Sequence, residues 1–448
     1  MENETNYYLP AFFTIYMNSS KSLENLFGSE EEHGLFHEYI HYLEDILTTY
    51  GVTYASQAFN NVKALYHHVK NKEKELDTVL TADEDTDKVS DLNKRLFNLY
   101  LQYTPETTEL SYSDSVVKIT PETIQVEFPD KTLKDVTSYK VFFQSGINIQ
   151  FGEQAIMESI SHILEKSIYS IFTKDYLLPY DLAYLIWIYY LPEESENYSA
   201  LLDLEEFSLQ FYNPADIFIM SLEKVKNGEI DISSGLYKRL LEIWHSKGKN
   251  ASELYQDGLT QLKSDINGVF VADVYSVFKT WILQVLKNAS KFREENDPIF
   301  SLILKGYDKS SIYEFFQNSE ECLGMPMVIN ADGAIYIRGI LKDGLPDVKL
   351  TKDNIGPWIF AFYSFLSVLA VYSVYKNVIN GDKEETPKCL LTEVCRHYNE
   401  YTKDGISLFD FDDDCIDRPE TKRIKETSFC PFAVVWQTFG LNNMYFFR

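Results

Sequence analysis

Residues 32–50 carry the pattern that most restricts how this chain can fold. Their apolar side chains recur at intervals of four, three, four and three positions, at Phe36, Ile40, Leu43, Leu47 and Tyr50. Those intervals mark one face of an α-helix, and a face so uniformly apolar has to be buried. Gly51 follows, and glycine is the residue most favoured directly after a helix. The sequence therefore predicts a core helix over 32–50 that ends at Gly51.

Within this predicted helix, residues 37–41 read His-Glu-Tyr-Ile-His. Residues four positions apart share a helix face, so His37 and His41 can take two corners of a tetrahedral zinc site. Glu38 is rotated by about 100° from His37, where it does not ligate but can take a proton from an activated water. The pattern predicts a catalytic zinc site with Glu38 as general base. The alternative is a helix surface that carries two histidines by chance.

The segment FHEYIHYLEDILTTYG, residues 36–51, resembles the motif helix of the zincin metallopeptidases. In the metzincin branch a glycine and a third histidine follow the motif, but Glu44 and Leu47 occupy those positions here, which excludes that branch. In the gluzincin branch a glutamate on a downstream helix supplies the third ligand. The resemblance implies a gluzincin-like, zincin-type core that binds zinc and hydrolyses peptide bonds.

For the third ligand the chain offers Glu158, in the segment GEQAIMESISHILE over 152–165. The segment changes to helical periodicity at its glycine, and Glu158 stands among Ile156, Met157 and Ile160. A glutamate in apolar surroundings is costly unless it is paired or ligates a metal. We therefore expect His37, His41 and Glu158 to hold the zinc ion.

Other acids and histidines near these positions leave alternatives open. His162 lies one turn after Glu158 and either supports a ligating histidine or ligates the metal itself. Glu153 and Glu165 are competing acids, although a place in the first helical turn suffices to explain Glu153. His33 precedes His37 by one turn, and three histidines in one row cannot surround an ion. His33 is therefore expected to support the site from outside or to lie at the surface.

The remaining patterns indicate an α+β fold that is predominantly α. Alternating apolar residues over 108–151 predict a small antiparallel sheet, and the opening segment PAFFTIYM predicts one strand. A hairpin is expected around Asp332-Gly333. Three regions are predicted: a zincin-like catalytic region over 1–172 with a β insertion at about 108–151, a mostly helical region over 173–385 with a hairpin near 325–339, and a cysteine-containing region over 386–448.

The charge balance restricts the partners of this chain. The sequence has 68 acidic and 41 basic residues, a net charge of −27. So acidic a surface repels phosphate backbones, and no long run of Lys or Arg offsets it, so no nucleic-acid partner is expected. The first residues lack a basic segment followed by an apolar run, and five cysteines are sparse. These features favour a cytoplasmic protein.

Two further patterns lie nearer the C-terminus. Residues 354–375 carry no charge and could span a bilayer of about 30 Å, but three serines and three tyrosines favour a buried core helix, so no membrane partner is expected. Four cysteines could hold a structural zinc or an iron–sulfur cluster. They are Cys389, Cys395, Cys415 and Cys430. They contain no Cys-x-x-Cys pair, which favours buried thiols.

These expectations lead to a zinc-dependent metallopeptidase that acts on protein or peptide substrates. An intracellular peptidase needs restraint, so a regulatory protein partner is also expected, as for a regulated effector. The alternative is a non-catalytic, partner-binding protein with a zincin-like core and a structural zinc. Structural sites are closed, whereas catalytic ones keep a position open to solvent.

Overall fold

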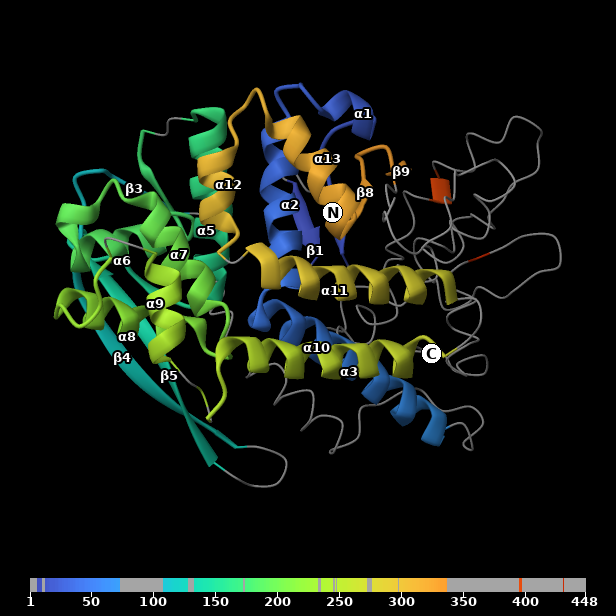
Figure 1. The fold of residues 1–448 in the computed structure, drawn as a ribbon, viewed down its shortest axis with the longest axis horizontal. Helices are drawn as coiled ribbons and strands as arrows, with labels where there is room; N and C mark the ends of the chain where they lie inside the picture. The colour runs from blue at the N-terminus through green and yellow to red at the C-terminus, as the bar shows by residue number, and fades with distance from the viewer. Residues whose placement is uncertain are drawn as a thin grey trace.

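The computed structural model describes residues 6–72 and 108–336, with gaps at 10–12, 128–132, 172–173, 233–234, 245, 247, 272–275 and 297, and residues 395, 396 and 430. The strands are β1 (Tyr7–Leu9), β2 (Thr14–Tyr16), β3 (Thr108–Leu110), β4 (Val116–Glu127), β5 (Leu133–Phe143), β6 (Asn148–Phe151), β7 (Tyr176–Leu178), β8 (Met327–Ile329) and β9 (Ile335–Tyr336). The helices are α1 (Leu23–Leu26), α2 (Glu32–Leu47), α3 (Thr49–Lys72), α5 (Glu153–Tyr169), α6 (Leu182–Tyr190), η1 (Pro192–Glu194), α7 (Tyr198–Ser208), α8 (Pro214–Lys226), α9 (Leu236–Ile243), α10 (Ala251–Val269), α11 (Ser276–Asn296), α12 (Phe300–Gly306) and α13 (Ile312–Leu323). This part of the chain is mostly helical with small sheets, in agreement with the predicted α+β class (Figure 1).

A four-stranded sheet in the order β1-β2-β8-β9 joins two distant parts of the chain. β8 and β9 form the hairpin that was predicted near 325–339, and β8 runs parallel to β2 with Thr14 opposite Met327. The strand expected in the segment PAFFTIYM is present as β2, and a second strand, β1, precedes this segment and pairs with β2 antiparallel. Phe13 has a positive φ of 49°, which turns the chain into β2.

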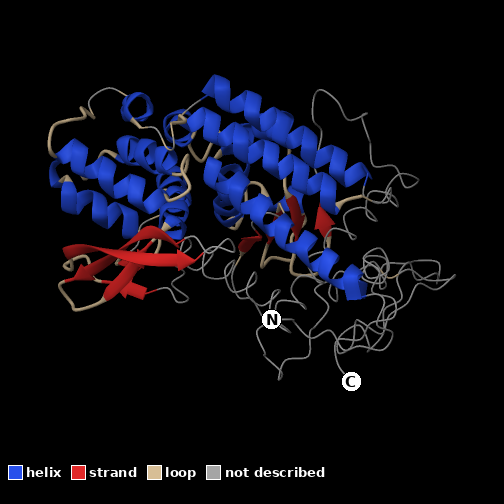
Figure 2. Cartoon of the chain, turned by 90° about the horizontal axis from the view of Figure 1, so that it is seen from below, coloured by secondary structure: helices blue, strands red, loops and turns tan. Residues whose placement is uncertain are grey.

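The predicted sheet over 108–151 is present as β4, β5 and β6, which pair antiparallel in that order. Figure 2 shows these long strands at one end of the molecule, against a group of helices. The hydroxyl of Tyr139 on β5 donates to Asp216 on α8 at 2.7 Å, and the Asn213 amide donates to the Thr137 carbonyl at 2.9 Å. These bonds fasten the sheet to the start of α8. A separate pair, β3 and β7, is also antiparallel.

Helix α2 lies between α5 and α13 and is buried along its whole length except at His33 (Figure 1). The predicted apolar face is therefore confirmed as core. Tyrosine hydroxyls fix the helix in place: Tyr42 donates to the carbonyl of Leu323 at the end of α13 at 2.7 Å. Tyr255 of α10 donates to the carbonyl of Ile46 at 2.7 Å. Burial and these hydrogen bonds hold α2 as a rigid support.

The predicted role of Gly51 as the residue that ends this helix is wrong. α2 ends at Leu47, and Gly51 lies within the first turn of α3. The break falls at Thr48, whose hydroxyl donates to the Glu44 carbonyl at 2.7 Å and accepts from the Gly51 N–H at 3.0 Å. A Cβ atom at Gly51 would overlap the backbone of Glu44 and Asp45. The glycine is needed because two helices meet there without room for a side chain.

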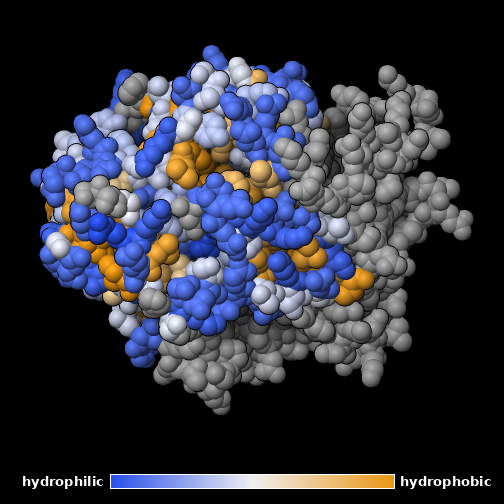
Figure 3. Space-filling model, in the orientation of Figure 1, coloured by the Kyte–Doolittle hydropathy of each residue, from blue (hydrophilic) through white to orange (hydrophobic). Residues whose placement is uncertain are grey.

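Several predictions concern residues outside the described part of the chain. They include the core helix over 354–375, Cys389 and Cys415; Cys395 and Cys430 are described and are buried. Within the described residues no helix has the length and apolar character needed to cross a membrane. The division of the chain into three regions stays a prediction. The described part of the face seen in Figure 3 is mostly hydrophilic, with smaller hydrophobic areas between.

Candidate metal centre

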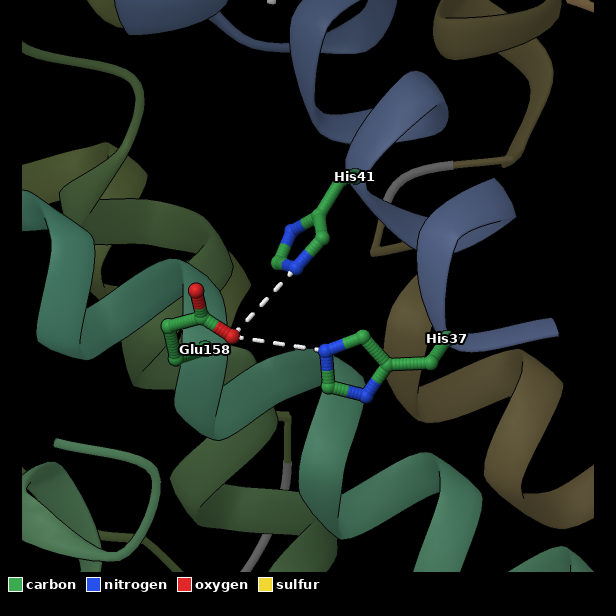
Figure 4. Close-up of side chains that lie close together, drawn as sticks. All are labelled: His37, His41 and Glu158. Carbon is green, nitrogen blue, oxygen red and sulfur yellow. Dashed lines mark hydrogen bonds and ion pairs between the residues drawn. The ribbon is translucent and has the colours of Figure 1, made fainter. Parts of the chain in front are cut away.

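Three of the predicted site residues come together where α2 packs on α5. His37 and His41 project from one face of α2, because they are one helical turn apart. Glu158 projects from α5 toward both rings (Figure 4). One oxygen of Glu158, Oε2, lies 3.3 Å from His37 Nε2 and 3.4 Å from His41 Nε2. The hydroxyl of Ser161, on the next turn of α5, lies 3.2 Å from His37 Nε2.

The spacing of these donor atoms suits a tetrahedral ion. One ligand atom from each of His37, His41 and Glu158 lies within 4.8 Å of the other two. Two ligands bound at about 2.1 Å in a tetrahedron are separated by roughly 3.4 Å. The nitrogen–oxygen separations of 3.3 and 3.4 Å match that value. Two imidazole nitrogens and one carboxylate oxygen also form a donor set that zinc accepts.

The other nitrogen of each histidine ring is held by a second carboxylate. His41 Nδ1 lies 2.8 Å from Glu44 Oε2, and Glu44 is fully buried. His37 Nδ1 lies 3.0 Å from Glu165 Oε2. A carboxylate can only accept a hydrogen bond, so Glu44 and Glu165 hold a proton on Nδ1 of each ring, and Nε2, which faces Glu158, is the nitrogen that would bind a metal in place of its proton. This is the arrangement that orients histidines for metal binding.

The charges in this cluster favour a positive group at its centre. Burial opposes the charged form of His37, but hydrogen bonds with Glu158 and Glu165 outweigh it and raise the pKa of His37 to about 9. Burial likewise opposes a carboxylate at Glu158, yet His41 and His37 hold the pKa of Glu158 well below its ordinary value. A metal ion bound here would take the place of histidine protons as the partner of Glu158.

Glu38 lies on the same helix, buried to 7% exposure. Burial raises the pKa of its carboxyl above the ordinary value, while His37 and His41 act in the opposite direction. Its carboxylate also accepts the backbone N–H of Tyr8 on β1. The Glu38 carboxyl therefore interacts electrostatically with all three residues of the group.

The competing residues take other positions. His33 is partly exposed and pairs with Glu165, so it stands outside the three-residue group as expected. His162 is buried but does not bond to either predicted histidine ligand; its ring nitrogens lie 3.9 Å from Glu165 and 3.8 Å from Asp181. Glu153 is buried elsewhere on α5 and accepts the Tyr50 hydroxyl at 3.1 Å. Its place in the first helical turn is therefore only part of its role.

Of three neighbours of the site, Glu44 and Tyr180 were not predicted as functional residues, and Glu165 was expected only as an acid that competes with Glu158. Glu44 and Glu165 are the carboxylates that hold the rings, and Tyr180 places its ring 5.9 Å from that of His37. For Glu44 the sequence holds a usable signal, since it follows His41 by three positions on one helix face. The sequence has no corresponding local signal for Glu165 or Tyr180, because only tertiary packing brings them to α2.

The site is recognised from the geometry of its residues. His37, His41 and Glu158 form a group close enough to bind a metal ion, with each histidine anchored by a carboxylate. Comparisons with protein-family models, with curated proteins and with solved structures find no match to this chain.

Proposed function

We propose that this protein is a zinc-dependent peptidase whose metal is held by His37, His41 and Glu158. The observation that carries the proposal is the convergence of two histidine Nε2 atoms on one carboxylate oxygen, at 3.3 and 3.4 Å. The resemblance of residues 36–51 to the zincin motif helix supports peptide bonds as the target. The four-stranded sheet beside α2 fits a zincin-like core, which remains part of the proposal.

The chemistry divides between the ion and the chain. When bound, zinc supplies a Lewis acid that polarises a carbonyl and makes water acidic near neutral pH. Glu38 accepts the proton of the attacking water and delivers it to the departing amine. Its buried position suits this role, because burial raises the pKa of the carboxyl and makes it a better acceptor. Glu44 and Glu165 keep the two rings in place during the reaction.

Access to the site favours the catalytic proposal over a closed structural zinc. The side chains of His37 and His41 are 11% and 10% exposed, and that of Glu158 is 19% exposed. A structural zinc ion has all four positions of its tetrahedron filled by protein ligands. Three protein ligands also leave the fourth position of a tetrahedron for water, as in catalytic zinc sites.

The test combines metal content with one substitution. Protein purified without chelator should contain about one zinc per chain by elemental analysis. Glu38→Gln should keep the zinc, because Glu38 is not a ligand, and should lose hydrolysis of a fluorescently labelled unfolded protein, because an amide accepts no proton. Glu31→Gln is the matched control, since Glu31 pairs with Lys21 near the start of the same helix and away from the cluster.

Three results would contradict the proposal in whole or in part. Protein that contains no zinc and takes up none would remove the metallopeptidase function altogether. Release of zinc by Glu38→Gln would make Glu38 a ligand and the assigned mechanism wrong. If Glu38→Gln kept both zinc and activity, another residue would be the base.

A further inference from the structure

Four tyrosines from four separate segments form a continuous row of rings. Tyr112 follows β3, Tyr176 lies on β7, Tyr184 on α6 and Tyr198 at the start of α7. The ring centroids of successive members lie 4.5, 6.3 and 5.7 Å apart. We call this set the tyrosine row. Tyr112 lies far from the other three in sequence, so only the fold completes the row.

The two ends of the row are open to solvent. Tyr112 is 50% exposed and Tyr198 is 38% exposed, while the two inner rings are partly buried. A tyrosine in the core would bury its ring and leave at most its hydroxyl near water. Exposed aromatic rings that touch one another are typical of recognition surfaces, where tyrosine is enriched.

The surroundings of the row are acidic. Segments 108–117 and 175–198, which supply all four rings, contain no Lys or Arg, and the exposed Lys118 and Lys174 directly adjoin them. Their acids are Glu109, Asp114, Asp175, Asp181, Glu193, Glu194 and Glu196. Lys166 neutralises Asp181 at 3.1 Å, but the exposed Glu109, Glu193 and Glu196 remain around the row. The negative field therefore favours a cationic partner and disfavours an acidic one.

The molecule itself shows how a cation sits on tyrosines of this region. Nζ of Lys226, on α8, lies 5.2 Å from the ring centroid of Tyr190 and 5.8 Å from that of Tyr189. Both tyrosines are on α6, the helix that also carries Tyr184. Cations bind ring faces at such distances, and arginine does so more often than lysine. Tyr112 and Tyr198, at the ends of the row, are the more exposed of its four rings, at 50% and 38%.

The chain segment that carries Tyr176 also supplies a residue of the metal centre, Tyr180. β7 begins at Tyr176, and the chain then passes through Pro179 to Tyr180, whose ring lies 5.9 Å from that of His37. Alternate side chains of an extended peptide are roughly 6.6 Å apart, close to the spacing of the rings. A peptide laid along the row could therefore place successive basic side chains on successive rings.

We propose that the tyrosine row binds an extended peptide segment rich in arginine and lysine. The row is then a docking site that selects basic segments of protein substrates, and the chain connects it to Tyr180 at the metal centre. The substrate role rests on the proposed peptidase function, whereas peptide binding at the row does not.

Binding is measured by fluorescence anisotropy in the Glu38→Gln protein at 150 mM salt, so that the probe stays intact. The probe is a fluorescein-labelled octapeptide of alternating arginine and glycine, compared with the same peptide carrying neutral citrulline. We expect the double substitution Tyr112→Ala and Tyr198→Ala to weaken arginine-peptide binding about five- to tenfold. Tyr313→Ala, which removes a ring of 44% exposure on α13, should leave binding unchanged.

The outcomes separate this proposal from the peptidase function. The docking site would be overturned if the double variant bound the arginine peptide as tightly as the parent protein. It would also be overturned if Tyr313→Ala weakened peptide binding as much as the double substitution. Equal affinity for the citrulline peptide, or preferential binding of a neutral oligosaccharide, would overturn it as well. Arginine-peptide binding that depends on the row would support the docking site even if the unsubstituted protein hydrolysed nothing, in which case only the peptidase function would fail.

Discussion

Replacing Glu44 by Gln is expected to weaken zinc binding although Glu44 is not a ligand. Its carboxylate lies 2.8 Å from His41 Nδ1 and is fully buried. The carboxylate holds the ring with Nε2 toward Glu158 and makes it a stronger donor to a metal. Gln can still accept a hydrogen bond from Nδ1 but carries no charge. The variant should therefore bind zinc more weakly without losing the ligand.

The size of the effect follows from the kind of hydrogen bond that is lost. A bond to a charged group contributes about 1.5–3 kcal/mol, and a neutral bond about 0.5–1.5 kcal/mol. The difference of about 1–1.5 kcal/mol corresponds to roughly a fivefold to tenfold loss of affinity. Glu44→Ala leaves the Nδ1–H without an acceptor, so its loss should be larger, about 10–100-fold.

Zinc affinity is measured by competition with a chromophoric chelator at one pH, and circular dichroism checks that each variant is folded. Glu165→Gln should resemble Glu44→Gln, because Glu165 accepts from His37 in the same way. Glu31→Gln should not change the affinity. Unchanged zinc affinity in a folded Glu44→Ala protein would refute the reasoning, since His41 would then need no anchor.

Three further predictions concern other parts of the structure. Glu158→Ala should lower zinc affinity by orders of magnitude while Glu153→Ala does little; if His162→Ala had the large effect instead, His162 would be the ligand. Gly51→Ala should lower the free energy of unfolding by about 1–3 kcal/mol, because its Cβ would overlap the end of α2; a thermal melt that matched the unchanged protein would contradict this. Burial raises the pKa of Glu153 from 4.5 to about 8, so the folded protein holds this proton more tightly than the unfolded chain. The resulting stabilisation is complete below pH 4.5 and is lost as the pH rises to about 8. Glu153→Gln should remove that loss, on the order of a few kcal/mol, in urea denaturation at pH 5 and pH 8.5, and an identical pH dependence would count against it.

Local periodicity made part of the site predictable. His37 and His41 share a face in any α-helix, and an apolar setting singled out Glu158 on another helix. The contact between Glu44 and His41 follows from the same periodicity. The role of Glu165 does not, because it depends on how α5 lies against α2, which residue spacing within either helix does not determine.

The four-stranded sheet shows the limit of prediction at the level of the fold. β2 and β8 have three residues each, too few for alternation of side chains to identify a partner. The hairpin was predictable from its Asp332-Gly333 turn, but its place beside β2 was not. Gly51 illustrates the same limit, since a glycine that ends a helix and one that allows close contact look alike in sequence.

The parallel pairing of β2 with β8 has a consequence for synthesis of the protein. All three proposed metal ligands have been made once residue 158 is complete, but β8 ends only at Ile329. At about 5–20 residues per second, a ribosome needs roughly 15–60 s to go from β2 to β8. During that interval α2 lacks the carbonyls of Leu323 and Gly324 that its tyrosines bind. The three proposed ligands are therefore synthesised early, whereas the carbonyls that hold α2 in place are synthesised late. A chain truncated before residue 323 would contain His37, His41 and Glu158 but would lack the carbonyls of Leu323 and Gly324 that Tyr42 and Tyr39 bind.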